Sequence, residues 1–412
     1  MTTTAHSTTT PDDTSLIFSA ALFLLPALAL NTHAGITLIE LAILCGSIFY
    51  SRRLWRERTT LFGSTGAIMA AFALTFALGL ASLLTTGLDF KFIENPLKAL
   101  LVMPVIGLVV IGRPKGDWFW YGLCAGTVGA TCLALYQRFV LHEPRAEGFH
   151  MAIMFGDVAM AMGLMSLAGI QRFARTRLSL LPLLTFAAGI TASILSGTRG
   201  GWVALVLSVV PLYSYGRHAA GRRIIVFALA GVSLLAASAC VPELGVRQRF
   251  ADIAGDIQKY RDGNPDTSIG LRLENWKGAV RIFSEHPLTG IGRANYEQGL
   301  NDLVARKELS PAVSGLKHAH NELLNAFATE GILGGFTLIF LYAAPLAFFV
   351  RRLRHDPACR PYALAGLLLV LSFIDFGLTQ VLFVHHIGSA FYAITAGALA
   401  GLCIRHGHRR QE

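Results

Sequence analysis

The sequence predicts an all-α protein, a polytopic integral membrane helical bundle with one large helical loop outside the membrane. Three observations support this fold class. Of the 412 residues, 53% are hydrophobic and 15% are charged, whereas soluble domains carry about 25% charged residues. The mean hydropathy is +0.54. The apolar residues are gathered in runs of about 20, long enough to cross a bilayer. These features exclude a soluble enzyme, a disordered chain and a nucleic-acid-binding module.

The apolar runs predict about twelve spans. They lie near residues 15–32, 34–51, 61–86, 92–112, 116–139, 151–171, 178–197, 200–216, 222–241, 321–350, 361–380 and 382–404. The first pair and the last pair are short or closely spaced, so eleven spans also fit. The expected organisation is a membrane bundle of nine spans (1–241), a large loop (242–320) and a bundle of three spans (321–412). No internal repeat is evident.

The distribution of Lys and Arg predicts the orientation. With a cytoplasmic N-terminus, every inward loop is basic, as the positive-inside rule requires for twelve spans. These nineteen residues are Arg52, Arg53, Arg56, Arg58, Arg113, Lys115, Arg172, Arg175, Arg177, Arg217, Arg222, Arg223, Arg351, Arg352, Arg354, Arg360, Arg405, Arg409 and Arg410. The outward short loops and segment ends hold Lys91, Arg138, Arg145 and Arg199. The net charge of +10 is therefore mostly an orientation signal, with both termini expected in the cytoplasm.

The large loop predicts two helices and a turn-rich end. It opens with VPELGVRQRFADIAGDIQKY, whose apolar spacing suits a short amphipathic helix, and breaks at DGNPD. The stretch LRLENWKGAVRIF predicts a second helix, and HPLTGIGRANY follows it. Because the other connections are short, a loop of this length is expected to be functional.

Two arginines on the outer side are candidates for anion binding. Arg199 lies in the Gly-rich turn LSGTRGGW, where small neighbours let a ligand approach the guanidinium. Arg272 shares one helical stripe with Trp276 and Ala279, so it can face the bundle. The alternatives are a snorkelling interfacial arginine for Arg199 and a solvated, ion-paired charge for Arg272.

His320 is the candidate proton acceptor, because imidazole exchanges protons near neutral pH. It lies in KHAHNELLNAF, where the loop enters the tenth span. His318 would point about 200° away from it if this stretch were helical. An extended His-x-His pair could instead bind metal, although no third ligand is evident nearby. A helix cap is a further alternative for His320.

Topology assigns these three side chains to one outer face, and together they suit a specific chemistry. Guanidinium groups form forked hydrogen bonds to phosphate, and a neutral imidazole can take a proton from an attacking hydroxyl. This combination describes glycosyl transfer from a diphosphate lipid. The chain contains no DxD pair for a metal, so the arginines could replace the metal ion, and no cofactor is expected.

Intramembrane acids are functional candidates by default. Asp375 is expected to orient His320 or an arginine, and Asp157 either supports the site or bonds between helices. His385 and His386 open the last span and are interpreted as interfacial.

His320 and Asn321, followed after nine residues by Gly331 and Gly334, match the pattern H-N-x9-G-x-x-G. This pattern resembles the signature of the bacterial O-antigen ligases and their polymerase relatives. TRGGW around Arg199, Arg272 with Trp276, and HPLTGIG at residues 286–292 resemble the same superfamily. Gly335 stands where that signature often has Thr.

The resemblance implies a GT-C-like bundle in the bacterial inner membrane with a periplasmic active site. The implied reaction moves O-antigen polysaccharide from undecaprenyl diphosphate to lipid A-core in one inverting, metal-independent displacement. His320 would be the base, and Arg199 and Arg272 would hold the donor diphosphate. Apart from the resemblance, Asn321, Asp375 and His318 are expected to support these three residues. Alternatives are a repeat-unit polymerase of the same superfamily, a protein glycosyltransferase, and a lipid-linked-sugar flippase or transporter. Transporters place their sites near the midplane, whereas the candidates here gather at one face.

Overall fold

The computed structural model describes residues 13–83, 92–198, 200–216, 231 and 246–408. Within these ranges every regular element is helical, which confirms the all-α prediction. The bundle helices are α1 (Asp13–Ala29), α2 (Gly35–Phe49), α3 (Ser51–Leu83), α4 (Glu94–Ala99), α5 (Val102–Gly112), α6 (Asp117–Leu135), α7 (Ala152–Leu167), α8 (Ile170–Phe173), α9 (Leu181–Ser196), α10 (Val203–Gly216), α15 (Glu322–His355), α16 (Arg360–Gly377) and α17 (His386–His408).

Within the described ranges, six helical stretches are long and apolar enough to cross a membrane, and five shorter apolar helices accompany them. The six are Ser51–Ser82, Glu94–Gly112, Asp117–Val140, Glu322–His355, Arg360–Gly377 and His386–His406. The predicted span 222–241 lies outside the described residues, apart from Gly231. The chain is therefore a helical membrane protein, and the count of about twelve spans stays a prediction.

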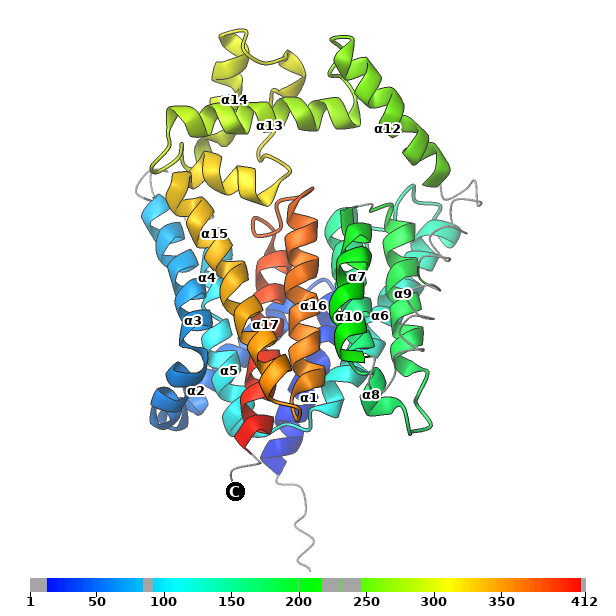
Figure 1. Cartoon of the computed structure of the whole chain (residues 1–412), viewed down its shortest axis with the longest axis vertical. Helices are drawn as coiled ribbons and strands as arrows, with labels where there is room; N and C mark the ends of the chain where they lie inside the picture. The colour runs from blue at the N-terminus through cyan, green and yellow to red at the C-terminus, as the bar shows by residue number, and fades with distance from the viewer. Residues whose placement is uncertain (1–12, 84–91, 199, 217–230, 232–245, 409–412) are drawn as a thin grey trace, which may run out of the picture.

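Three further helices form a layer across one end of the bundle (Figure 1). They are α12 (Val246–Arg261), α13 (Ser268–Glu285) and α14 (Tyr296–Ala305). Helix α13 lies across the bundle helices, and α14 lies on its far side. The start of α1 and the end of α17 lie at the opposite end of the bundle. We refer to α12, α13 and α14 as the cross layer.

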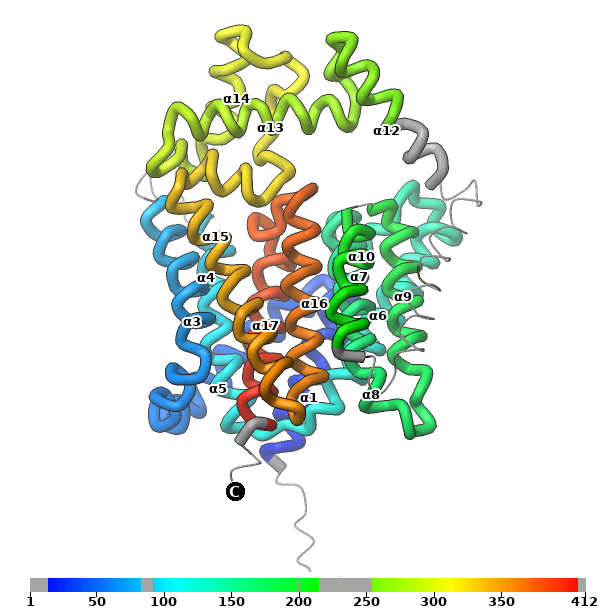
Figure 2. The backbone as a smooth tube through the Cα atoms, in the orientation of Figure 1, coloured from blue at the N-terminus to red at the C-terminus, as the bar shows by residue number. Residues whose placement is uncertain are grey.

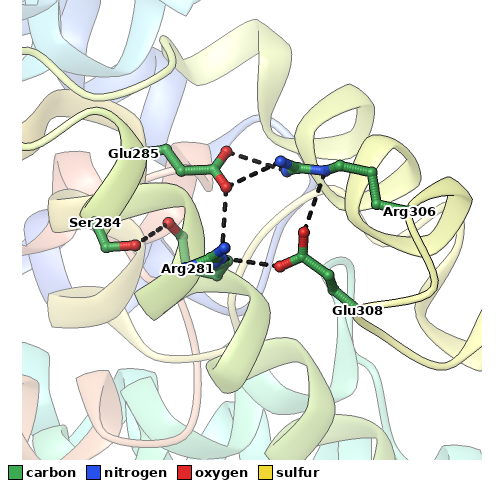
Figure 3. Close-up of polar contacts among 5 residues, drawn as sticks. All are labelled: Arg281, Ser284, Glu285, Arg306 and Glu308. Atoms are coloured by element: carbon green, nitrogen blue, oxygen red, sulfur yellow. Dashed lines mark hydrogen bonds and ion pairs between the residues drawn. The ribbon is translucent and has the colours of Figure 1, made fainter.

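The cross layer has its own small core and a surface ion-pair network. The core residues Ala279, Ile282, Tyr296, Leu300, Leu303, Leu309, Val313, Ala319 and Ala328 form a cluster separate from the main bundle core. On the surface, Arg281 donates to Glu308 at 2.8 Å and Arg306 donates to Glu285 at 3.0 Å (Figure 3). The bond from Arg306 lowers the pKa of the Glu285 carboxyl. Because these pairs are exposed, they contribute little to stability compared with the core.

Helix α3 begins earlier than the sequence predicted. Arg52, Arg53, Arg56 and Arg58, expected in an inward loop, lie on the first turns of α3. Arg and Glu are good helix formers, so the helix continues beyond its apolar part. It is interrupted at Thr65, where φ is −130° and ψ is 15°.

Helix α15 links the cross layer to the bundle, and it is broken at Gly331, where φ is 65° and ψ is −155°. It packs on α3, α13 and α16, and Figure 2 shows it descending from the cross layer beside α16. Ile332 donates its backbone N–H to Pro287 at 2.8 Å, and Ala328 accepts from Ile291 at 3.0 Å. The HPLTGIG segment therefore replaces the hydrogen bonds that the break removes from α15.

Glycine is required on both sides of the contact between α15 and the HPLTGIG segment. A Cβ at Gly331 would lie 2.3 Å from the carbonyl oxygen of Leu288, and a Cβ at Gly290 would lie 2.3 Å from the backbone nitrogen of Glu330. Both residues have positive φ, a region that side chains rarely adopt. The glycines of the two motifs thus allow two backbones to touch, which fixes where α15 enters the bundle.

Candidate active site

The candidate site begins with the segment of residues 317–321, which enters α15 without being helical. His320 adopts the left-handed backbone conformation, with φ at 51°. This conformation costs a side-chain-bearing residue about 1–2 kcal/mol, so the segment needs outside support. Asn275 on α13 donates to the carbonyl of His318 at 2.9 Å. Asn325 on α15 accepts from the backbone N–H of Ala319 at 3.1 Å.

Asn275 is itself held in place. It is fully buried, and Tyr296 on α14 donates to its side-chain oxygen at 2.7 Å. A chain of hydrogen bonds therefore runs from α14 through α13 to the backbone beside His320. Neither Asn275 nor Tyr296 was predicted from the sequence. The sequence did contain one indication of Asn275. It is a polar residue directly before Trp276, on the face of α13 that was expected to meet the bundle.

The next two residues fasten the same segment to the loop between α16 and α17. Asn321 caps α15 by accepting from Leu324 at 3.0 Å, and its amide nitrogen donates to the carbonyl of Leu378 at 3.1 Å. The Glu322 carboxylate accepts from the backbone N–H of Leu382 and, at 3.2 Å, from that of Phe383. The residues after His320 in the H-N signature are therefore structural, because they hold two distant loops together.

This fastening brings His320 against Gln380. The imidazole Nδ1 lies 2.9 Å from the side-chain oxygen of Gln380, which is fully buried. With the amide oxygen facing the ring, Nδ1 carries the proton and donates it, and Nε2 keeps a lone pair. Gln380 is a further residue of the candidate site that was not predicted from the sequence. A lone Gln beyond a helix end gives no distinctive signal in one sequence.

The surroundings of His320 keep its imidazole neutral. Burial lowers its pKa below the usual value of 6.5, the bond to Gln380 acts in the opposite direction, and the charge of Arg272 lowers the pKa further. The neutral form is the one that can accept a proton, so the site favours the basic form at neutral pH.

Two more histidines lie beside His320. The ring centroids of His318 and His320 are 4.3 Å apart, and those of His318 and His385 are 6.1 Å apart. Burial and its two neighbours lower the pKa of His318 to about 4, and burial also lowers that of His385. The segment is not helical, so His318 and His320 share a site. Among the described residues, no group of three or more His, Cys, Asp or Glu is arranged to hold a metal ion.

Arg272 reaches this site from the cross layer. It lies one turn before Trp276 on α13, and both side chains are half-buried. Its guanidinium is close enough to His320 to affect the imidazole pKa. The predicted proximity of Arg272 and His320 is therefore present in the structure, although they are 48 positions apart in the chain.

Arg199 lies outside the described residues, but the turn on either side of it is described. A Cβ at Gly200 would lie 2.2 Å from the hydroxyl of Thr379, the residue before Gln380. Gly200 thus packs against the loop that contains Gln380.

The two predicted acids lie at this same turn. Asp375 accepts a hydrogen bond from the backbone N–H of Ala204 at 2.7 Å, at the start of α10. It was expected to orient His320 or an arginine. In the structure Gln380 meets the His320 ring, whereas a contact of Asp375 with Arg199 stays a prediction because residue 199 lies outside the described residues. Asp157 on α7 is fully buried, 3.0 Å from where a Cβ of Gly201 would lie. His386 lies apart from this site and pairs with Glu40 at 3.2 Å.

Comparisons with known proteins agree with the motifs. Residues 184–339 match the model of the O-antigen ligase family (Wzy_C), a range that includes positions 199, 272, 320 and 331. A 153-residue stretch is 27% identical to the O-antigen ligase of Escherichia coli K12, covering 37% of this chain and 34% of that protein. An uncharacterized protein of Haemophilus influenzae is 25% identical over 333 residues, covering 79% of this chain and 83% of that protein. These matches confirm the resemblance to the O-antigen ligase superfamily.

Proposed function

We propose that this protein is a glycosyltransferase that moves O-antigen polysaccharide from undecaprenyl diphosphate to lipid A-core at the periplasmic face of the inner membrane. The observation that carries the proposal is the buried His320 imidazole, bonded through Nδ1 to Gln380 and close to the charge of Arg272. The family match over residues 184–339 supports the choice of substrates.

In the proposed reaction, the acceptor sugar hydroxyl gives its proton to Nε2 of His320 as its oxygen attacks the anomeric carbon of the donor. The bond from that carbon to the diphosphate oxygen breaks, and undecaprenyl diphosphate leaves with the electron pair. A single displacement inverts the anomeric configuration. Since attack and departure occur together, one base is sufficient for the proton transfer, and the leaving diphosphate needs groups that bind an anion.

The leaving diphosphate needs positive charge more than a proton donor. Arg272, near His320, is proposed to form forked hydrogen bonds to the diphosphate. We propose the same role for Arg199, whose neighbour Gly200 packs on Thr379. Two guanidinium groups on the diphosphate would perform the charge neutralisation that a metal ion performs in many sugar-diphosphate enzymes, so we propose a metal-independent reaction.

Deletion of the gene in the native host tests the proposal. We expect surface lipopolysaccharide that ends at the core, with lipid-linked polymer of normal chain length accumulating in the membrane. If the core instead carries one repeat unit, the protein is a polymerase. If purified protein yields no covalent product from donor and acceptor in proteoliposomes, yet moves the lipid-linked donor between leaflets, it is a transporter.

A further inference from the structure

A basic groove lies at the end of the bundle opposite the cross layer. Its volume is about 820 Å³, and it lies between the start of α1, the junction of α2 and α3, and the ends of α5 and α17. Four arginines line it: Arg53, Arg56, Arg113 and Arg405. Among its described lining residues, Glu57 is the single carboxylate. The groove has no part in the proposed transfer reaction, because the His320 site lies at the other end of the molecule.

Three of these arginines are not neutralised by a described carboxylate. Within the described part of the chain, no salt bridge involves Arg53, Arg56 or Arg113. The fourth, Arg405, donates to the carbonyl of Pro114. Like charges gathered around one concave site raise the local potential and attract an anion. Guanidinium groups are suited to phosphate, which they can bind through two parallel hydrogen bonds.

The rest of the groove combines apolar walls with hydroxyl groups. The rings of Phe18 and Tyr50 lie 5.3 Å apart and line it together with the apolar ends of α5 and α17. Hydroxyl groups come from Thr14, Ser15 and Thr60. A site of this composition suits an amphiphile whose phosphate meets the arginines while its glycerol and upper acyl chain meet apolar surface.

Exposed apolar side chains beside the groove indicate that it lies at a membrane surface. Phe49 and Ile48 are 80% and 76% exposed, and Trp55 is 68% exposed. Exposed residues of this size would be unfavourable in water, whereas Trp and other aromatic residues are enriched where a bilayer meets water. The guanidinium of Arg58 lies 4.3 Å above the Trp55 ring, which combines a cation and an aromatic ring at the headgroup level.

We propose that this groove binds the headgroup of an anionic phospholipid from the leaflet opposite the His320 site. Basic pockets between membrane helices on the cytoplasmic side are suited to such headgroups. The lipid phosphate would contact Arg53, Arg56 and Arg113, and the acyl chains would continue along α5 and α17. Binding would join four helices that are distant in sequence and thereby stabilise this end of the bundle.

Native mass spectrometry of the purified full-length protein tests this site. The protein is mixed with cardiolipin, phosphatidylglycerol or phosphatidylethanolamine at equal concentrations, and bound lipid is counted. We expect cardiolipin and phosphatidylglycerol to remain bound and phosphatidylethanolamine to dissociate. Equal retention of all three lipids would overturn the proposal. Inorganic phosphate at the same concentration should not raise the melting temperature, and an increase as large as that given by cardiolipin would indicate a free-phosphate site instead.

Two triple variants with the same change in charge locate the binding. Arg53→Gln/Arg56→Gln/Arg113→Gln should weaken retention of anionic lipid by about tenfold or more, since each basic residue near an anionic surface adds to binding. The control, Arg175→Gln/Arg177→Gln/Arg354→Gln, alters exposed arginines that do not line the groove. It should bind like the wild type, and equal weakening in both variants would refute a specific groove. If the first triple variant is poorly folded in the absence of lipid, the three single variants replace it, and unchanged lipid retention in all three would also refute the proposal.

Discussion

The imidazole Nδ1 of His320 lies 2.9 Å from the side-chain oxygen of Gln380, although the two residues are 60 positions apart in the chain. Asn321 and Glu322 hold the two segments together through bonds to Leu378, Leu382 and Phe383. The consequence is chemical. Nδ1 is engaged as a donor, so the Nε2 lone pair is available to an acceptor hydroxyl.

Replacement of Gln380 by Leu removes the group that fixes the ring. We expect transfer by purified protein to fall by about 10–100-fold, less than the loss of a general base itself, because the imidazole remains but rotates and changes tautomer. The turnover number should fall more than the affinity for donor. Gln380→Asn, which keeps the amide on a shorter side chain, should recover part of the activity, whereas a Leu variant as active as the wild type would exclude this positioning role.

The dependence of the rate on pH distinguishes a positioning role of Gln380 from a purely structural one. Burial lowers the pKa of His320, so the wild-type rate should be constant near pH 7 and should fall only below pH 6.5, as the imidazole gains a proton. In Gln380→Glu, a carboxylate beside the ring favours the charged imidazole and raises its pKa, by about 1–3 units for a contacting pair. The acidic limb of the profile should therefore move to higher pH. An unchanged limb would contradict the assignment of His320 as the titrating base.

Arg272 is expected to act on the donor diphosphate. Arg272→Ala should reduce transfer by about 10²-fold, a loss typical of one transition-state donor. Arg272→Lys should recover little of it, because an ammonium group cannot fork onto phosphate. The measurement is initial rate against donor concentration. The exposed Arg261→Lys on α12 serves as the control and should retain full rate. Full activity of Arg272→Lys would show that a point charge is sufficient.

The break in α15 depends on Gly331. Gly331→Ala places a Cβ 2.3 Å from the Leu288 carbonyl oxygen in a conformation that Ala avoids. We expect a loss of about 2–4 kcal/mol in the free energy of unfolding, measured by thermal or denaturant unfolding in detergent. In the control Gly255→Ala on α12, the Cβ meets nothing within 4 Å. That variant should be about 1 kcal/mol more stable than the wild type. Similar stability of the two variants would contradict the role of the break.

The helical membrane fold was predictable from the sequence because apolar runs of about 20 residues match the thickness of a bilayer and exceed what most soluble cores contain. That Arg272 and His320 lie on the same side was also predictable, because both belong to the one large loop of residues 242–320. The partner of His320 was not. An intramembrane acid such as Asp375 is conspicuous in a sequence, whereas Gln380 is not, and only the bonds from Asn321 and Glu322 to the α16–α17 loop determine which of them meets the ring.

Glycine motifs show a similar limit. The pattern of Gly331 and Gly334 after His320 was recognisable, but its physical reason was not. Gly331 is needed because the backbone of α15 touches the HPLTGIG segment, where Ile332 bonds to Pro287 and Ala328 to Ile291. The spacing of residues in the sequence does not reveal this contact. The extent of α3 was misjudged for a different reason, since helix propensity extends beyond the apolar residues that define a span.

The most direct test of the proposed base is transfer in proteoliposomes that contain purified protein, undecaprenyl-diphosphate-linked polysaccharide and lipid A-core, without a membrane gradient. The wild type should form covalent product, and His320→Ala should lose about 10²–10⁴-fold in rate while retaining the wild-type melting temperature. His355→Ala, which removes an exposed imidazole at the far end of α15, should keep full activity. Product formation by His320→Ala at the wild-type rate would contradict the central claim that this imidazole accepts the proton of the attacking hydroxyl.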